Sequence, residues 1–164
     1  MTEGTSRMRK RIRHFFALTV IGLALAGCSG ITVHHEPPVS SDSPELIQEA
    51  IEFGDWSLPT DGKVLLVRRE HLDDVKYNMV VETSPNGLTH MLEQSKYTAQ
   101  FRKWYSIQPE YEQVIAGPPL ETSPNVQKAQ DLFVSTEGDS MIRDVLVDER
   151  TPELRIVHIE FRGQ

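Results

Sequence analysis

Three histidines lie in the part of the chain that we expect to fold, and each could serve as a general base. They are His71, His90 and His158. A Ser-His-Asp triad assembles in space without fixed sequence spacing, so the sequence leaves such a site open. His71 and His90 adjoin turn residues, and His158 falls opposite the apolar residues of the last predicted strand, where we expect it to meet solvent. Exposed or capping roles are therefore favoured over catalysis.

Acidic residues offer no sharper signal for catalysis. Glu137-Gly138-Asp139-Ser140 places a serine beside two acids but lacks the flanking glycine of a nucleophile elbow, and we interpret it as a polar turn. Sugar hydrolysis needs two carboxyl groups about 5 to 9.5 Å apart, and Glu110 and Glu112 show how easily a chain with many acids supplies such pairs by chance. No phosphate loop, dinucleotide fingerprint, metalloprotease helix or EF-hand loop is present. The sequence predicts no catalytic and no cofactor-binding residues.

His34-His35-Glu36 could hold a metal ion. Neighbouring side chains of an extended chain point in opposite directions, however, and two ligands make a weak site. We therefore predict no metal site here.

An aromatic cluster spans Phe101, Trp104, Tyr105 and Tyr111. Aromatic residues are enriched in contact hot spots, so the cluster could be a partner patch or a sugar platform. If this segment is a strand, Phe101 and Tyr105 point inward, and Trp104 lies on the other face beside Arg102. A role in the core is favoured for the cluster, and Trp104 is the first residue to test.

The single cysteine, Cys28, follows a leader with a clear pattern. Five basic residues lie between Arg7 and Arg13, and an apolar run of twelve residues extends from Phe15 to Ala26. This is the layout of a secretory signal peptide, and the run is shorter than the roughly 20 apolar residues of a membrane-spanning helix. Leu25-Ala26-Gly27 then places one aliphatic and two small residues directly before the cysteine.

Residues 7–28 resemble the signal peptide and lipobox of bacterial lipoprotein precursors. The resemblance implies that a diacylglycerol is attached to Cys28 and that the signal peptidase recognises Leu25, Ala26 and Gly27 and cuts before Cys28. Two or three acyl chains give stable anchoring. With Ser29 rather than aspartate next, we expect an outer-membrane location in a host with two membranes, and the outer leaflet of the cell membrane otherwise. An ordinary signal peptide with a chance cysteine is the alternative, and translation could start at Met1 or Met8.

Composition narrows the function classes. Without the leader, residues 28–164 carry 12 basic and 23 acidic residues, a formal charge of −11. Nucleic acids and anionic membrane faces attract basic patches, so we expect neither as a partner of this domain. If Cys28 carries lipid, no thiol remains for a disulfide, a thiolate zinc site or a cysteine nucleophile.

The chain divides into a leader (1–27), a lipidated cysteine with a flexible tether (28–43) and one acidic domain (44–164). The tether is rich in serine and proline and has no apolar period, so we expect it to be disordered. In the domain, antiparallel strands interspersed with two or three helices predict an α+β fold. The expected helices are 44–53, a short one with Leu88, Met91 and Leu92 spaced for one face, and 123–133. The expected strands are 63–69, 77–82, 97–107, 111–116, 141–147 and 154–162, with a turn at 84–87.

These observations favour a non-enzymatic lipoprotein of the bacterial cell envelope. It would bind a protein partner or contribute to a surface assembly. One alternative is an envelope hydrolase acting on peptidoglycan or another polysaccharide, which would need a concave site with convergent histidines or acids. Another is a lipoprotein that binds a small molecule or a metal ion.

Overall fold

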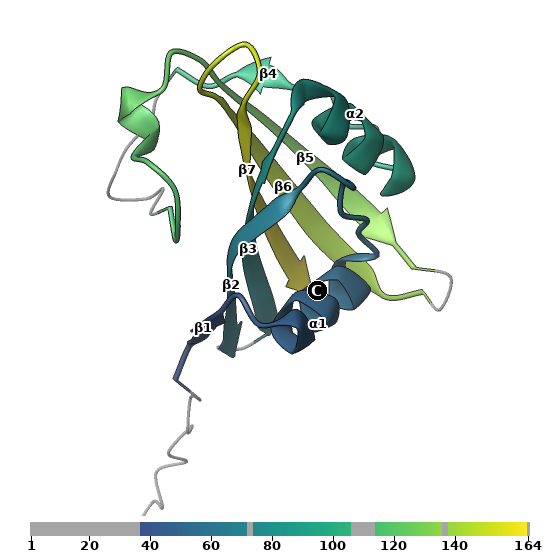
Figure 1. Ribbon diagram of the computed structural model, residues 1–164. Helices are drawn as coiled ribbons and strands as arrows, with labels where there is room; N and C mark the ends of the chain where they lie inside the picture. Colours follow the sequence, from purple (N-terminus) through teal and green to yellow (C-terminus); the bar gives the residue numbers. More distant parts are fainter. Residues whose placement is uncertain (1–36, 72–73, 106–113, 136–137, 164) are drawn as a thin grey trace, which may run out of the picture. The chain divides into compact units, whose positions relative to one another are not determined.

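The computed structural model describes residues 37–71, 74–105, 114–135 and 138–163. These residues form a seven-stranded antiparallel sheet, with strand order β1-β2-β3-β7-β6-β5-β4, and two helices (Figure 1). The expected combination of an antiparallel sheet and helices is present, although strands dominate. The elements are β1 (Val39–Ser41), α1 (Pro44–Gly54), β2 (Lys63–His71), β3 (Val75–Thr83), α2 (Pro85–Gln94), β4 (Arg102–Lys103), the short 3-10 helix η1 (Leu120–Thr122), β5 (Val126–Val134), β6 (Ser140–Glu149) and β7 (Arg155–Gly163).

Helix α1 matches the sequence prediction for 44–53. The Ser43 hydroxyl accepts a hydrogen bond from the Leu46 amide at 3.4 Å, and proline occupies the first turn, where its missing N–H costs nothing. Gly54 ends the helix for a reason that the sequence does not reveal. A Cβ at this position would lie 2.5 Å from Cζ of Phe161, so only glycine lets the helix end approach β7. The left-handed cap falls on Asp55, with φ of 42°.

Helix α2 corrects one prediction. We expected a turn at 84–87, but these residues open the helix. Ser84 is the N-cap and accepts from the Gly87 amide at 3.0 Å, and Pro85 fills the first turn. The serine-proline pair therefore has the same role here as before α1, and the helical spacing of Leu88 and Met91 is confirmed.

The strand predictions for 63–69, 77–82, 141–147 and 154–162 are confirmed. Strands β2 and β3 form one hairpin, and β6 and β7 form another. Strand β7 also pairs with β3, which joins the two hairpins in the middle of the sheet. Alternation is as expected: Tyr77, Met79 and Val81 are all buried on the face that Val157, Ile159 and Phe161 also share.

Three predictions in the middle of the chain are wrong or fall outside the described residues. Of the expected strand 97–107, the structure describes residues 97–105, and among these only Arg102–Lys103 is a strand; Tyr97 is buried in the core directly after α2. The expected helix 123–133 is strand β5, paired with β6 along its whole length. Residues 114–116 of the expected strand 111–116 are not in a strand, and 111–113 lie outside the described residues.

Strand β1 moves the domain boundary. We expected residues 28–43 to be a tether, but Val39–Ser41 pairs antiparallel with Val67–Arg69 of β2 at one margin of the sheet. Ser41 also accepts a hydrogen bond from the Ser43 amide at 3.0 Å, next to the start of α1. Residues 39–43 are therefore part of the folded domain, because β2 offers an otherwise unpaired edge to them.

Both helices cover the same face of the sheet (Figure 1). Their apolar side chains, including Leu46, Ala50 and Met91, pack on β3, β6 and β7 and form the main core with Trp56 and Tyr97. Helix α1 is also tied to β3 by the Tyr77 hydroxyl, which donates to the Glu49 carboxylate. Among the described residues, neither helix has the length and apolar content needed to cross a membrane.

A buried arginine lies within this core. The Arg143 side chain is 1% exposed and donates to both carboxylate oxygens of Asp131, at 2.9 and 2.6 Å. It also donates to the Ser95 carbonyl at the end of α2, at 3.0 Å. The guanidinium lies over the Phe133 ring, 4.5 Å from its centroid, and beside Trp56. Arg143 therefore links β6, β5 and α2. Its buried charge is stabilised by hydrogen bonds to Asp131 and Ser95 and by contact with ring faces.

Candidate functional site

The face of the sheet opposite α1 and α2, called here the helix-free face, presents every second residue of five strands. Register fixes which residues meet there: Asn78, Glu160 and Asp144 lie in one cross-strand row. The next row contains Val80 and His158, followed by Leu146 and Lys128. Apolar and charged side chains therefore alternate over this face, in contrast to the apolar core side.

Residues 114–123, called here the covering segment, cross one end of the helix-free face and contain η1 (Figure 1). Leu120 of this segment is 2% exposed and packs with Val126 and Leu146 of the sheet. Val114 and Trp104 pack against the same small cluster. This cluster is separate from the main core and belongs to the other side of the sheet.

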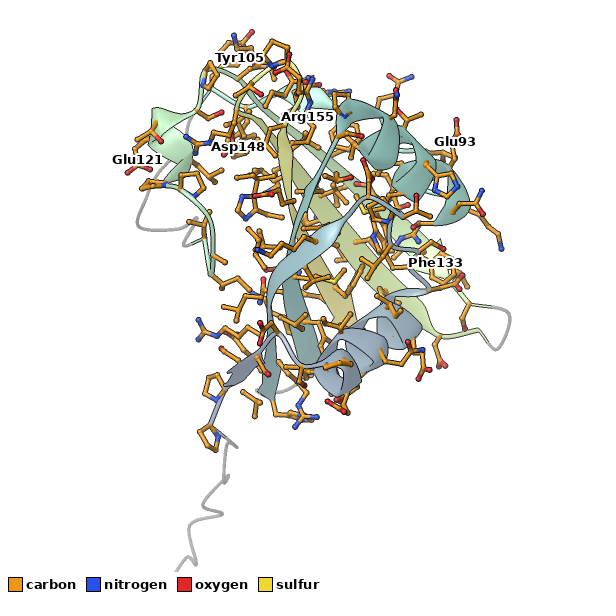
Figure 2. All side chains as sticks on the ribbon, viewed as in Figure 1. Glu93, Tyr105, Glu121, Phe133, Asp148 and Arg155 are labelled. Atoms are coloured by element: carbon orange, nitrogen blue, oxygen red, sulfur yellow. The ribbon has the colours of Figure 1, made fainter. Side chains whose placement is uncertain are left out.

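Arg150 attaches the covering segment to the sheet. Its guanidinium donates to the carbonyls of Pro118 and Pro119, at 3.2 and 2.6 Å, and to Oγ1 of Thr122 at 2.6 Å. Its Nε donates to Oδ2 of Asp148 at 2.5 Å, and Asp148 is fully buried. Figure 2 shows Asp148 on the side of the sheet that bears η1, and Phe133 on the helix side. Arg150 therefore makes four hydrogen bonds, one to Asp148 and three to the covering segment.

Between the covering segment and the helix-free face lies a hollow of about 480 Å³. This volume is within the range of small-ligand pockets, about 300–1,000 Å³. Val80 and Leu146 supply apolar surface from the sheet, and Val114, Ile115 and Leu120 supply it from the covering segment. The lining also includes three cations and three carboxylates: Arg68, Lys76, Lys128, Glu70, Asp144 and Glu160. Because these charges balance, the hollow suits a ligand with apolar and polar parts rather than a simple ion.

Asp144 and Glu160 are directly opposite each other on β6 and β7. Arg162 bridges them, with NH2 2.9 Å from Asp144 Oδ2 and Nε 2.8 Å from Glu160 Oε1. Lys76 lies 2.7 Å from the other Glu160 oxygen, and Gln130 donates to Asp144 at 2.9 Å. Both carboxylates are thus committed to partners within the sheet. The pair is thus part of an ion-pair network within the sheet, although Oδ1 of Asp144 has no hydrogen-bond partner among the described residues and lies 3.9 Å from Nζ of Lys128.

His158 lies on the face that we predicted, but the prediction that it meets solvent is wrong. It is half-buried and lines the hollow, and its Nε2 is shielded from solvent without a hydrogen-bond partner among the described residues. Burial, with a smaller contribution from Arg150, lowers the pKa of His158 to about 4. The imidazole is therefore neutral at pH 7, and the covering segment and neighbouring side chains explain the burial that a single strand could not reveal.

The low pKa of His158 predicts a loss of stability in acid. An unfolded histidine binds a proton below about pH 6.5, whereas this one does so only near pH 4. The unfolding free energy should therefore fall as the pH drops from about 6.5 to 4, by on the order of 2–3 kcal/mol, and this contribution should be level below pH 4. Urea unfolding at pH 7.5 and 4.5 measures the loss.

The matched variant for this measurement is His158→Asn, because a change of pH acts on the whole protein and not on the imidazole alone. The difference between wild type and His158→Asn isolates the imidazole. His90→Asn serves as a second control, since His90 is exposed on α2. Equal acid sensitivity in all three proteins would contradict a buried neutral His158.

The other two histidines that the structure describes lie apart from the hollow. His71 ends β2 opposite Val75, and His90 is exposed on α2. Neither lines the hollow with His158. Gly138, with φ of 96°, and Asp139 connect β5 to β6, where the Ser135 amide donates to the Asp139 carbonyl; the polar-turn prediction is confirmed for these residues.

The aromatic cluster divides between three environments. Phe101 packs against the main core and Tyr97, as predicted, whereas Tyr105 is 82% exposed and its predicted inward position is wrong (Figure 2). Strand β4 ends at Lys103, so no alternation places Tyr105. Trp104 packs beside Leu120 in the small cluster on the other side of the sheet, as its predicted face implies, and Lys128 lies 4.9 Å from its ring centroid.

Several predicted site residues lie outside the described residues. They are Leu25, Ala26, Gly27, Cys28, His34, His35, Glu36, Glu110, Tyr111, Glu112 and Glu137. Among the residues that the structure does describe, no group of three or more histidines and acids is placed to hold a metal ion.

Comparisons with family models, curated proteins and solved structures find no match.

Sequence analysis missed the residues that organise this site. Asp148 and Arg150 both fall between the expected strands 141–147 and 154–162, with no sign that they pair beneath residues about 30 positions earlier. The Asp144–Glu160–Arg162 network was equally invisible, because its members lie on two strands. Arg143 alone left a readable signal: a charge between Met141 and Val145, on the core-facing side of an alternating strand.

Proposed function

We propose that the chain is a lipid-anchored lipoprotein of the bacterial cell envelope whose domain, which we class as α+β, binds a protein partner without catalysing a reaction. The anchor part rests on the lipobox-like residues 25–28. The binding part rests on one observation, the hollow on the helix-free face. Apolar and charged side chains line it together, and its Asp144 and Glu160 carboxylates are held by ion pairs. Such a surface suits an extended protein segment with mixed side chains.

The anchor is tested by Cys28→Ser. Wild-type protein should incorporate labelled palmitate and remain with membranes, whereas Cys28→Ser should take up no label and leave the membrane fraction. Ser29→Ala is the matched control and should behave as wild type. A mature wild-type protein with an unmodified thiol, or with an uncut leader, would contradict the lipoprotein assignment.

The binding face is tested by site-specific photocrosslinking in intact envelopes. A photoreactive amino acid at Asn78, which lines the hollow, should give a discrete adduct with a protein. The same probe at His90, exposed on α2, should not. Equal adducts from both positions, or none from Asn78, would contradict a partner on the helix-free face. Repeating the Asn78 experiment with Cys28→Ser separates the roles of location and surface.

The hydrolase alternative has one feature in its favour, since His158 lines the same hollow as Asp144 and Glu160. Against it, Nε2 of His158 makes no hydrogen bond to another described residue, and both acids are ion-paired. Incubating the purified protein with peptidoglycan provides the test. Release of soluble fragments by wild type, but not by His158→Asn, would replace the binding proposal.

A further inference from the structure

Most of strand β5 lies at an uncovered margin of the sheet. Strand β4 pairs with β5 only at Gln127 and Lys128, and β5 continues to Val134 (Figure 1). The part from Ala129 to Val134 therefore has β6 on one side and no paired strand on the other among the described residues.

The backbone groups that face this margin can be assigned from printed hydrogen bonds. The Val126 carbonyl accepts from the Trp104 amide on the β4 side, so even-numbered residues of β5 direct their polar groups outward. On the opposite side, the Ser135 amide bonds to the Asp139 carbonyl, so odd-numbered residues face β6. By this alternation, the amide and carbonyl groups of Gln130, Leu132 and Val134 point away from the sheet.

The same stretch exposes apolar side chains. Leu132 is 60% and Val134 is 57% exposed, both on the helix-free face. Natural sheets usually protect such margins with lysine, proline, bulges or inward-pointing charges. Here the only charge between Ala129 and Val134 is Asp131, and it points to the core side, where it pairs with Arg143. Residues 129–134 contain no lysine, proline or bulge, and their one inward-pointing charge, on Asp131, is neutralised by Arg143.

Beyond the proposed function, we infer that this margin pairs with its counterpart in a second copy of the chain. An antiparallel β5–β5 pair with Leu132 on the two-fold axis places Gln130 opposite Val134 of the second copy and Asp131 opposite Phe133. A shift that put Asp131 on the axis would bring two carboxylates together, so charge favours the Leu132 register over that one. The sheet then continues from one copy to the other.

Charge also explains why a second copy fits here. The chain has a formal net charge of −7, so two copies repel over most approaches. Residues 129–134 place one charge per copy at the contact, and Arg143 neutralises it with two hydrogen bonds. The β5 margin is thus a surface where two acidic molecules can meet with matching hydrogen-bond groups, apolar contact and no like charges opposed.

Sedimentation of the purified full chain over a range of concentrations tests the inference. Wild type should sediment as a dimer at high concentration. Leu132→Lys should weaken dimerisation at least 100-fold, because two ammonium groups then meet at the axis. His90→Lys, on exposed α2, should dimerise as wild type. Circular dichroism should show the same fold in all three.

Mixing variants identifies the register. Leu132→Lys and Leu132→Glu should each be monomeric alone and should form a mixed dimer when combined, because only position 132 faces itself. A monomeric wild type, or a dimer that survives Leu132→Lys, would overturn the inference. A wild-type dimer without rescue in the mixture would overturn the Leu132 register.

Discussion

Replacing Arg143 by alanine is expected to lower the free energy of unfolding by about 3–5 kcal/mol. The change leaves the Asp131 carboxylate, which is 17% exposed, without its bidentate partner, and it removes the donor to the Ser95 carbonyl. It also leaves a cavity among Phe133, Trp56 and Tyr97. Urea unfolding followed by circular dichroism measures the loss.

Two further variants separate charge from packing. Arg143→Met fills much of the volume but leaves the Asp131 carboxylate without a cationic partner, so this variant should remain strongly destabilised. Combining Arg143→Met with Asp131→Leu removes the pair together and should recover most of the stability. Arg102→Ala, at an exposed position of β4, is the matched surface control and should change stability by less than about 0.5 kcal/mol. If the Arg143→Met protein were as stable as wild type, the Arg143 side chain would stabilise the fold only by filling space and not through its charge.

Arg150→Ala is expected to cost about 3 kcal/mol and to release the covering segment while the sheet stays folded. Asp148 is completely buried and would lose its only stated cation, and the Pro118 and Pro119 carbonyls would lose their donor. Hydrogen exchange is the specific readout. The amides of Thr122 and Ser123, which bond to Pro119 and Leu120, should lose protection, whereas amides of β3 should not.

Arg150→Lys provides the comparison, since it keeps the charge near Asp148 but cannot donate in several directions from one plane. It should retain most of the stability and lose part of the protection at Thr122. If Arg150→Ala left both unchanged, the guanidinium would not be what attaches the covering segment. If Arg150→Ala does release the covering segment, photocrosslinking from Asn78 in this variant shows whether the hollow needs the attached segment to bind its partner.

Residue patterns within a single segment predicted those strands and helices whose structure depends mainly on their own sequence. Alternation identified β3 and β7, because one side of each strand must be buried, and an aliphatic run identified β2. Serine-proline pairs illustrate the limit. Ser43-Pro44 and Ser84-Pro85 open helices, whereas Ser123-Pro124 precedes a strand. The apolar residues after the third pair fit a helix, but pairing of β5 with β6 over nine positions outweighs that preference.

The hollow could not be predicted from spacing. Its lining comes from five strands and from a segment without regular structure apart from η1, and these meet only through the strand order. His158 shows the consequence, because its face was predictable and its burial was not. A charge on the core-facing side of a strand is the one such signal that a sequence does display, as Arg143 demonstrates.

Strand β1 sets a mechanical limit on any anchored form of this protein. If Cys28 carries the lipid, ten residues separate it from Val39, which span at most about 35 Å. Pulling β1 away from β2 would free Val39–Ser43 and lengthen the segment between Cys28 and the folded domain by about 17 Å, up to the start of α1. Unpairing of these three residues under tension would therefore extend the segment between the lipid and α1. An anchored copy could then reach a partner over a wider range of distances.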